Sequence, residues 1–511
     1  MKFMIKKLIF CLLLINSTFL GISQTVIITH GYSMYGTTDP VSTWMTDMAN
    51  SIVSRVGGGE IRVYNPQSGD FDIFSGSGLP KILLFGWKDE TNEPGHGFSE
   101  DAGAALFTSL MKGMLQGDFN LNSMHFIGHS RGSVVNSEAV ERLLANGFSV
   151  EQVTYLDPDD GGLYVAYSDQ DCNPDSIASG IEGWNGIIWA DDYWQNKLFF
   201  AYGRVVEGTF PEYLGTIGHQ EVHNWYATTI ADTSIHDGFY FSLLGGGSSF
   251  RNPVTGLQRN PFFNPYSDGI VNGNLEKGNW QIVSVPGWYY HGGSGNAIKD
   301  STFLLLDSTR TNRTHDRFYV PPDAAQIAFD YKILKPDSSG LIPNTDKLQV
   351  IINGTVVLDN IYMDSTMHVW KHLSFDITPY QNSVQTIKFQ LVDENGGTTN
   401  LNSAVWLDNI QMVEATVHIY DIRIEKPVVK AFPNPASSEI NFIFENSINP
   451  VTKITIYDIV GKEVFMENKP IQAEVKSYKM NVSFLNPGLY LYKINNEDII
   501  SVGKLVITST R

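Results

Sequence analysis

The segment HFIGHSRGSVV (residues 125–135) decides how the first half of the chain is interpreted. Gly128, Ser130 and Gly132 fit the pattern G-x-S-x-G, in which a serine occupies a tight turn between a strand and a helix. A β-rich run ends at Gly128, and the residues from the turn to Leu144 carry apolar side chains at helical spacing. The segment therefore predicts strand, turn and helix, with Ser130 as a candidate nucleophile.

Residues 24 to about 250 alternate between β-rich runs and segments with helical spacing. This alternation predicts a mostly parallel sheet with helices on both faces. Chemistry in such sheets lies at the carboxyl ends of the strands, so the candidate site is expected there. The β-rich runs are QTVIITHG, KILLFGW, SMHFIGHS and VEQVTYLD.

The composition fits a folded, multidomain chain. Its 511 residues exceed one ordinary domain, and a charged fraction of 17% argues against extensive disorder. The formal net charge of −19 disfavours nucleic acid as a partner, because long-range repulsion slows every encounter. The Gly- and Ser-rich stretch SLLGGGSSFRNP (242–253) marks a domain boundary.

Residues 1–23 have the features of a secretory signal peptide. Three lysines precede a short apolar run, Leu8–Ile15, and two small residues are spaced for cleavage before Gln24. The mature chain would then hold one cysteine, Cys172, which excludes an intramolecular disulfide. We expect an exported protein whose stability depends on its packed cores.

A serine nucleophile needs a base and an acid, and after a G-x-S-x-G turn the acid precedes the histidine in the chain. Asp157 directly follows the strand-like run VTYL, so it is expected at a strand's carboxyl end. Asp159 and Asp160 are the alternatives, and both also fit a turn acid or a cation ligand. The position directly after the strand favours Asp157.

Several histidines are candidates for the base. His219 and His223 lie in GHQEVHNWYATTI at a spacing that also fits a structural pair or metal ligands. A histidine at the entrance to a helix reaches both Ser130 and the acid better than one inside it. We therefore expect His219 as the base, His223 as the alternative and His236 as a weaker candidate, and we expect His129 to pack.

The oxyanion of a tetrahedral intermediate needs two backbone N–H donors. One is expected from Arg131, directly after the nucleophile. The other is expected from Tyr32, in the turn after the first strand, where Gly31 permits a tight turn. This chemistry needs no metal, so no cofactor is expected.

These motifs resemble those of the α/β-hydrolases of the lipase superfamily, in outline the animal pancreatic and lipoprotein lipases. The resemblance implies an α/β-hydrolase fold and ester hydrolysis by Ser130, Asp157 and His219. Arg131 stands where the family has leucine and the disulfide-linked lid is absent, so the resemblance does not extend to interfacial activation or triglyceride preference. The matching residues are His30-Gly31-Tyr32, Gly128-His129-Ser130, Leu156-Asp157-Pro158, and His219 with Trp225-Tyr226 and Ile230.

The segment between the acid and the base is unusually aromatic, and two interpretations stay open. It forms either a cap that supplies an apolar acyl pocket or ordinary core. The cluster DQDCNPD (169–175) leaves room for a structural calcium, although its spacing matches no calcium loop and a solvated loop is the simpler interpretation. The aromatic residues are Trp184, Trp189, Tyr193, Trp194, Phe199, Phe200 and Tyr202.

Residues 268–415 lack a helical period and consist of short β-rich runs, which predicts a β-sandwich. The opening run IVNGNLEKGNW and the closing run VWLDNIQMV resemble the jelly-roll, galactose-binding-like modules of secreted carbohydrate-active enzymes. The resemblance implies a carbohydrate ligand held by exposed aromatic residues, against the alternative of a spacer. The candidates are Trp280, Trp288, Tyr289, Tyr290 and Trp370.

Residues 427–511 form a third region of short alternating strands, which predicts a small all-β C-terminal domain. The region resembles the type A sorting domain of the Bacteroidetes type IX secretion system. The resemblance implies passage through the outer membrane, removal of the domain, and an enzyme that is secreted or attached to the cell surface. The matching residues are Phe432-Pro433-Asn434-Pro435, 456–462 (IYDIVGK), Pro487-Gly488-Leu489-Tyr490 and Lys504-Leu505-Val506.

The sequence as a whole predicts a secreted serine hydrolase that cleaves carboxylic esters, with a lipid or acyl ester as substrate. One alternative keeps the catalytic residues and directs them to an acylated polysaccharide through the sandwich. Another is a surface adhesin on an inactive hydrolase scaffold. The expected order of the catalytic candidates along the chain favours an enzyme.

Overall fold

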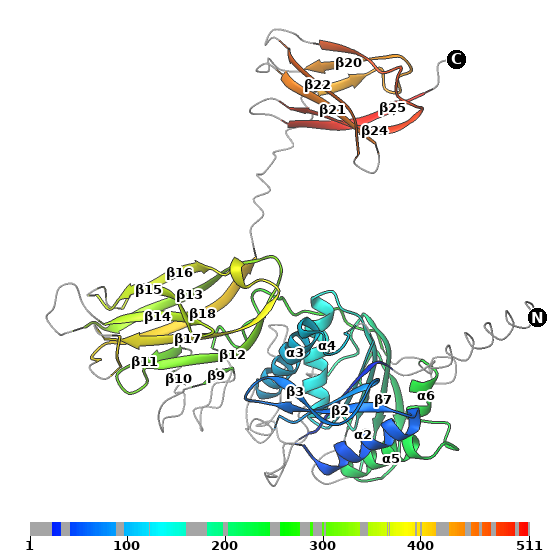
Figure 1. The fold of residues 1–511 in the computed structure, drawn as a ribbon, viewed down its shortest axis with the longest axis vertical. Coiled ribbons are helices and arrows are strands. Elements are labelled where there is room, and N and C mark those ends of the chain that lie inside the picture. Colours follow the sequence, from blue (N-terminus) through cyan, green and yellow to red (C-terminus); the bar gives the residue numbers. More distant parts are fainter. Residues whose placement is uncertain are drawn as a thin grey trace, which may run out of the picture. The chain divides into compact units, whose positions relative to one another are not determined.

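The computed structural model divides the chain into two compact units, Met1–Ala415 and Thr416–Arg511. Each unit has its own hydrophobic core. Figure 1 shows helices around a sheet in one part of the first unit and strands in the other. The structure describes residues 23–31, 41–87, 97–121, 123–159, 181–197, 203–245, 256–275, 287–289, 299–300, 303–337, 346–364, 366, 368–393, 396–398, 401–414, 429–444, 451–458, 462–471, 477–495 and 500–508.

An eight-stranded sheet organises the first part of unit 1, in the order β3-β2-β4-β1-β5-β6-β7-β8. All neighbouring pairs are parallel except β2 and β3, which form an antiparallel hairpin. The strands are β1 Thr25–Thr29, β2 Gly59–Asn65, β3 Asp70–Ser77, β4 Lys81–Phe85, β5 Met124–His129, β6 Val150–Leu156, β7 Ile187–Trp194 and β8 Phe210–Tyr213.

Helices cover both faces of this sheet, and strand β1 shows why. Its residues are all buried, and Ile27 belongs to one core while its neighbours Val26 and Ile28 belong to another. Successive strand residues point to opposite faces, so a strand buried throughout needs cover on both sides. Helices α3 (Phe98–Gln116) and α4 (Gly132–Ala145) supply one cover. The other cover consists of α2 (Thr43–Val56), α5 (His219–Ala231) and α6 (Phe239–Leu243).

The second part of unit 1 is a β-sandwich, with sheet orders β10-β11-β18-β13-β16 and β15-β14-β17-β12-β9 around one core. All its strand pairs are antiparallel. A 3-10 turn, η2 (Thr378–Tyr380), precedes β17. The strands are β9 Trp288–Tyr289, β10 Lys299–Asp300, β11 Phe303–Leu306, β12 Asn312–Val320, β13 Ala324–Lys335, β14 Lys347–Ile352, β15 Thr355–Tyr362, β16 Trp370–Asp376, β17 Ser383–Val392 and β18 Ala404–Glu414.

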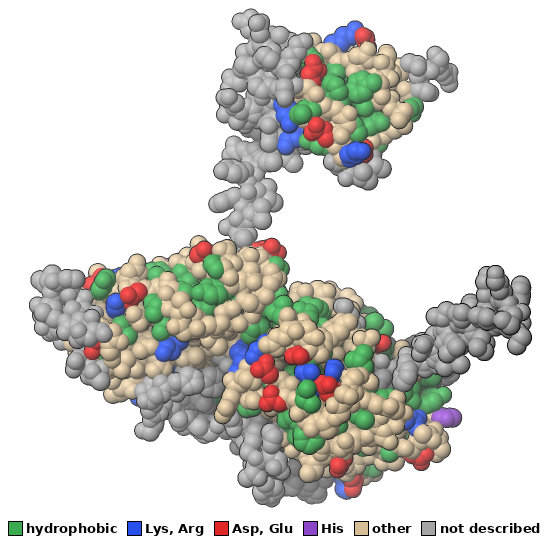
Figure 2. Space-filling view, viewed as in Figure 1, with side chains coloured by type: hydrophobic (Ala, Val, Ile, Leu, Met, Phe, Trp, Pro, Cys, Tyr) green, Lys and Arg blue, Asp and Glu red, His purple; other side chains and the backbone are tan. Residues whose placement is uncertain are grey.

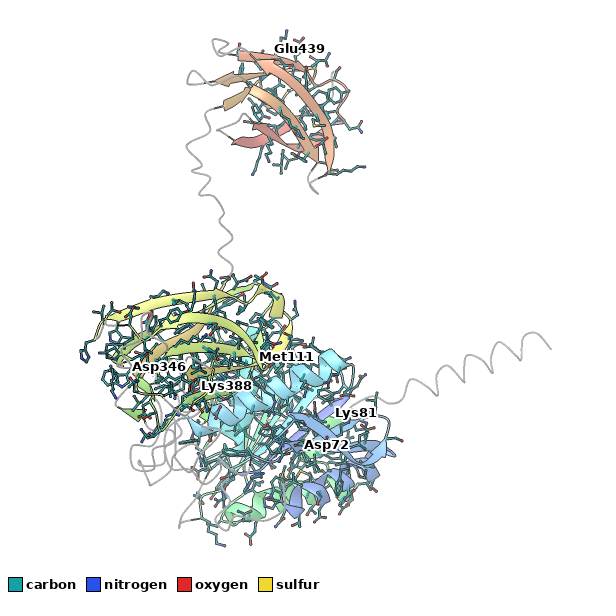
Figure 3. All side chains as sticks on the ribbon, turned by 60° about the vertical axis from the view of Figure 1, so that its left-hand side comes forward. Asp72, Lys81, Met111, Asp346, Lys388 and Glu439 are labelled. Atoms are coloured by element: carbon teal, nitrogen blue, oxygen red, sulfur yellow. The ribbon has the colours of Figure 1, made fainter. Side chains whose placement is uncertain are left out.

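The sandwich packs against α3 through the sheet that contains β12 and β17. The ring of Tyr319 on β12 meets Phe107 of α3 edge to face, with centroids 6.0 Å apart. The backbone N–H of Gly287 donates to Asp101 Oδ2 of the same helix at 2.9 Å. Figure 3 labels Met111 of α3 and Lys388 of β17 at this junction. The other sheet of the sandwich is therefore the one that faces away from α3.

Unit 2 consists of two antiparallel sheets, in the orders β19-β20-β23 and β22-β21-β24-β25. Its core includes Ile440 and Phe442 from the first sheet and Ile456 and Leu505 from the second. The strands are β19 Val429–Phe432, β20 Glu439–Phe444, β21 Val451–Asp458, β22 Glu463–Ile471, β23 Ser477–Asn481, β24 Gly488–Asn495 and β25 Ile500–Ile507.

The predicted fold class, an α/β hydrolase, is wrong for this chain. The described residues contain twenty-five strands and five α-helices, and four of the five sheets have only antiparallel pairs, so the chain is mainly β. The predicted alternation of strands and helices fails in two places. The turn at 66–69 closes the hairpin of β2 and β3, and the aromatic segment adds β7 and β8 to the sheet.

The aromatic segment contributes core where the structure describes it. Trp184, Trp189 and Tyr193 are buried, and the last two lie on β7 inside the sheet. Trp194, at the end of β7, lies against Tyr213 of β8 with ring centroids 4.7 Å apart. Phe199, Phe200 and Tyr202 lie outside the described residues. The cap interpretation therefore does not hold for the described aromatic residues.

Several other predictions fall outside the described residues. These are the signal peptide up to residue 22, Cys172, the cluster at 169–175, Tyr32, and the sugar-contact candidates Trp280 and Tyr290. No helix in the described ranges is long and apolar enough to span a membrane.

The predicted division of residues 24–250 from 268–415 stays a prediction, because both parts lie within unit 1. Acidic and basic side chains are interspersed on the face shown in Figure 2.

Candidate active site

The candidate residues lie at the carboxyl edge of the eight-stranded sheet because its central strands are parallel and in register. Thr29 on β1 pairs with Gly128 on β5, and His129 pairs with Leu156 on β6. Leu156 in turn pairs with Tyr193 on β7. The residues that directly follow these strands therefore share one edge of the sheet, as expected for a site in a parallel sheet.

Ser130 occupies a strained turn between β5 and α4. Its φ of 56° lies in the left-handed region, which is uncommon for a residue with a side chain and clusters at functional sites. The turn is held by the Ser130 N–H, which donates to the Leu156 carbonyl at 3.0 Å. A Cβ at Gly132 would lie 2.6 Å from the carbonyl oxygen of Thr29, so only glycine fits where α4 crosses β1. The sequence pattern thus predicted the local geometry of this turn correctly.

Asp157 is the acid that reaches the candidate base. It follows β6 with a φ of 48°, and its side chain is fully buried. Its Oδ2 accepts a hydrogen bond from His219 Nδ1 at 2.5 Å. Asp159 has no such contact with His219 among the described residues, and Asp160 lies outside them.

His219 is the first residue of α5, at the entrance predicted for it. The backbone N–H of Gly218 donates to the Glu221 side chain and caps the helix start. The His219 carbonyl accepts a hydrogen bond from His129 Nε2 at 3.1 Å, which ties the helix start to β5. The backbone of His219 is therefore fixed from both sides, while its Nδ1 faces Asp157.

His223 lies one helical turn further along and points elsewhere. Its Nε2 hydrogen-bonds Gln220 Oε1 at 2.9 Å, and its ring stacks on Trp44 of α2 at 4.4 Å between centroids. Burial lowers the pKa of His223 to about 4. His236, the third candidate, stacks on Tyr240 at 4.6 Å. The structure thus brings His219 to the acid and gives His223 a packing environment.

His129 also packs, as the sequence predicted. Its ring centroid lies 4.6 Å from that of His219 and 4.8 Å from that of His223. Burial holds the pKa of His129 well below its usual range, and the neighbouring His219 lowers it further. The lowered pKa favours the neutral form of the His129 ring, which packs beside His219.

The turn after β1 approaches the serine closely. A Cβ at Gly31 would lie 2.9 Å from Ser130 Oγ, so the Gly31 backbone borders the nucleophile. The Trp87 indole N–H donates to the His30 carbonyl at 2.7 Å and fixes this turn, and the Arg131 guanidinium lies 5.4 Å from the Trp87 ring centroid. Of the two expected oxyanion donors, the Arg131 amide lies at the start of α4, and Tyr32 is outside the described residues.

Two residues at the site were not predicted from the sequence, namely Gln195 and Gly203. Both donate hydrogen bonds to Asp157, from 38 and 46 positions further along the chain. Neither residue belongs to a recognisable motif, and the pairing of β6 with β7 brings Gln195, which directly follows β7, to the acid. No group of three or more His, Cys, Asp or Glu in the described part of the chain is arranged to hold a metal ion.

The comparisons with known proteins identify the C-terminal region. Residues 430–508 match the family model of the secretion system C-terminal sorting domain, which confirms the predicted type IX sorting domain. The protein is therefore exported by this system and is secreted or attached to the cell surface. No curated protein matches the chain.

Similar solved structures were found, with low TM-scores. CopC from Methylosinus trichosporium OB3b is 20% identical, covers 16% of this chain and 93% of its own, and has a TM-score of 0.14. The structure of CBM51-2 in complex with GlcNAc and INT domains from Clostridium perfringens ZmpB is 9% identical. The match covers 42% of this chain and 76% of that chain, with a TM-score of 0.17. A structure titled "CBM4 structure and function" is 15% identical. The match covers 28% of this chain and 99% of that chain, with a TM-score of 0.18.

Scores this low carry no inference about fold or ligand. The comparisons do not support the lipase resemblance of the first unit, so an assignment of hydrolase activity rests on the geometry of the side chains alone.

Proposed function

We propose that this chain is an exported serine hydrolase that cleaves carboxylic esters through an acyl-enzyme. The observation that carries the proposal is the 2.5 Å contact between His219 Nδ1 and Asp157 Oδ2, at the same sheet edge as a serine in a left-handed turn. A serine hydroxyl is a weak nucleophile, and a histidine oriented by a carboxylate is the support it needs.

In the proposed mechanism, each of the three side chains acts through a defined atom. Asp157 engages Nδ1 of His219, which leaves Nε2 to accept the hydroxyl proton as Ser130 Oγ attacks the ester carbonyl. The negative charge on the carbonyl oxygen forms beside the start of α4, where the Arg131 amide is the expected donor. The alcohol leaves with the proton from Nε2, and water then releases the carboxylic acid by the same steps.

Substitution of the proposed nucleophile and base tests this function. We expect Ser130→Ala and His219→Ala each to lower the turnover of p-nitrophenyl butyrate by at least about 10³-fold, as loss of a triad member does elsewhere. His223→Ala is the matched control from the same helix, and it should retain most of the turnover. Wild-type rates in Ser130→Ala, with the fold intact by circular dichroism, would overturn the assignment of Ser130 as the nucleophile. No turnover by the folded wild type would favour an inactive scaffold instead.

The substrate class that we propose is an acyl ester, with a lipid ester as one member. A panel of p-nitrophenyl esters from acetate to palmitate separates short acyl chains from lipid-length ones. A maximum at the longest chains would support a lipid substrate, and activity limited to acetyl esters would favour an acylated polysaccharide instead.

The polysaccharide alternative is favoured by a row of side chains on the sandwich sheet that faces away from α3. Lys332 on β13 pairs in register with Trp370 on β16 and Trp406 on β18. Its Nζ lies 5.0 Å from one indole ring centroid and 4.6 Å from the other, and Trp370 is 37% exposed. Trp288, which the sequence offered as a sugar contact, is only 1% exposed and belongs to the core.

Retention on insoluble glycans tests this alternative. Trp370→Ala should lower retention, while Tyr362→Ala, which removes an aromatic side chain 44% exposed on β15 of the other sheet, should not. Equal retention of wild type and Trp370→Ala would remove this surface from consideration.

A further inference from the structure

The carboxylate of Asp157 accepts four hydrogen bonds. Its Oδ1 accepts from the backbone N–H groups of Gln195 at 3.1 Å and Gly203 at 2.8 Å. Its Oδ2 accepts from the side-chain amide of Gln195 at 2.7 Å and from His219 Nδ1 at 2.5 Å. Two donors on each oxygen leave a fully buried carboxylate with one fixed orientation.

The orientation of the Gln195 amide is also determined. Gln195 is fully buried, and its Oε1 accepts from the Lys197 backbone N–H at 2.5 Å. The carbonyl end of the amide therefore faces Lys197, and the NH₂ end must face Asp157. One side chain thus joins the loop after β7 to the oxygen that also faces His219.

The backbone of Gly203 lies directly against the carboxylate of Asp157. A Cβ at this position would lie 2.3 Å from Asp157 Oδ1 and 2.9 Å from Asp157 Cα. Only glycine permits its N–H to approach the acid so closely. Both residues donate to Oδ1 through their backbone N–H groups, and only Gln195 also donates to Oδ2, through its side-chain amide.

We propose that Gln195 is a positioning residue of the site, which holds the Asp157 carboxylate in line with His219 Nδ1 and moderates its negative charge. The inference rests on the proposed function. A carboxylate with fewer donors attracts a proton more strongly and stabilises the imidazolium of the neighbouring histidine, so the removal of Gln195 Nε2 changes how the pair titrates. A residue that only filled space would leave that titration unchanged.

The test compares two buried glutamines in the full chain. Gln195→Met removes the donor at nearly constant length. Gln152→Met is the matched control, because Gln152 on β6 is also buried but donates to Thr154 and Asp191, at 3.4 and 3.5 Å, instead of to Asp157. Gln195→Leu also removes the donor and adds no ionisable group beside Asp157, so it serves if the Met variant fails to fold. The readouts are kcat, KM and the pH profile for p-nitrophenyl butyrate, with Ser130→Ala measured beside them.

We expect Gln195→Met to lower kcat by roughly 10- to 100-fold with little change in KM, and to move the acid-side half-maximum of kcat/KM upward by about one pH unit. Gln195→Leu should move it in the same direction, and Gln152→Met should keep the wild-type profile. If wild type is active and Ser130→Ala is not, a wild-type kcat and pH profile in folded Gln195→Met, or in Gln195→Leu where Met fails to fold, overturns the role of Gln195 alone. If wild type itself has no esterase activity, or if Ser130→Ala retains it, the proposed function fails instead.

Discussion

A methyl group added at Gly31 tests whether the turn after β1 is built around the nucleophile. The new Cβ would lie 2.4 Å from Ser130 Cβ, 2.9 Å from Ser130 Oγ and 2.8 Å from the carbonyl oxygen of His129. Carbon atoms in contact normally lie about 3.5–4.0 Å apart, so the serine or the turn must move by roughly 1 Å. Gly31 does not have a left-handed φ, so alanine is strained there by this contact and not by its backbone.

A displacement of about 1 Å strongly disturbs the alignment of a catalytic atom, whereas a packed core accommodates it at a moderate cost in stability. We expect Gly31→Ala to lower kcat/KM for p-nitrophenyl butyrate by about 10²-fold. The free energy of unfolding should fall by roughly 1–3 kcal/mol, which is typical of overpacking. Urea unfolding followed by circular dichroism measures the second quantity on the same preparation.

Gly58→Ala is the matched control for this experiment. An added Cβ at Gly58 meets nothing within 4 Å, and its φ is not left-handed, so both quantities should stay near wild type. A folded Gly31→Ala variant with wild-type kcat/KM would refute the claim that the Gly31 backbone borders the reacting atom.

Two further predictions concern buried ionisable side chains. Burial raises the pKa of Asp192 well above its usual range, so the folded chain keeps a proton that the unfolded chain loses, and this group's contribution to stability falls as the pH rises. We therefore expect the melting temperature of Asp192→Asn, relative to wild type, to increase between about pH 5 and pH 8; parallel pH dependences would contradict this. Arg142 Nη2 contacts Glu100 Oε1 at 3.1 Å inside the core. Arg142→Met should destabilise the chain by about 3–5 kcal/mol in urea unfolding, and adding Glu100→Gln should recover part of that loss; equal stabilities of the single and double variants would argue against a buried ion pair.

The geometry around Ser130 was predictable because local rules determine it. Glycines two positions either side of a serine, between a strand and a helix, leave few conformations for the turn, and the structure has the expected tight turn, with a left-handed φ at Ser130. The positions of Asp157 and His219 were predictable for a related reason, since Asp157 directly follows a strand and His219 begins a helix.

What the sequence did not reveal depends on pairing between distant segments. The aromatic run around Trp189 fits a cap as well as ordinary core, and its pairing with β6 makes it core. Trp288 is similar, because an aromatic side chain near the start of a sandwich fits either a ligand or a core, and burial between two sheets makes it core. Gln195 reaches Asp157 only through that same β6–β7 pairing. The prediction of the fold class was wrong for the same reason, because the sequence of a short β-rich run does not determine which strand it pairs with.

Covalent labelling of the nucleophile tests the central claim most directly. The full chain is treated with a fluorophosphonate probe, which reacts with activated serines, and the modified peptide is identified by mass spectrometry. We predict one adduct, on Ser130, which is lost in Ser130→Ala and strongly slowed in His219→Ala but not in His223→Ala. No adduct on the folded wild-type chain, or an adduct at another serine, would contradict the assignment of this site.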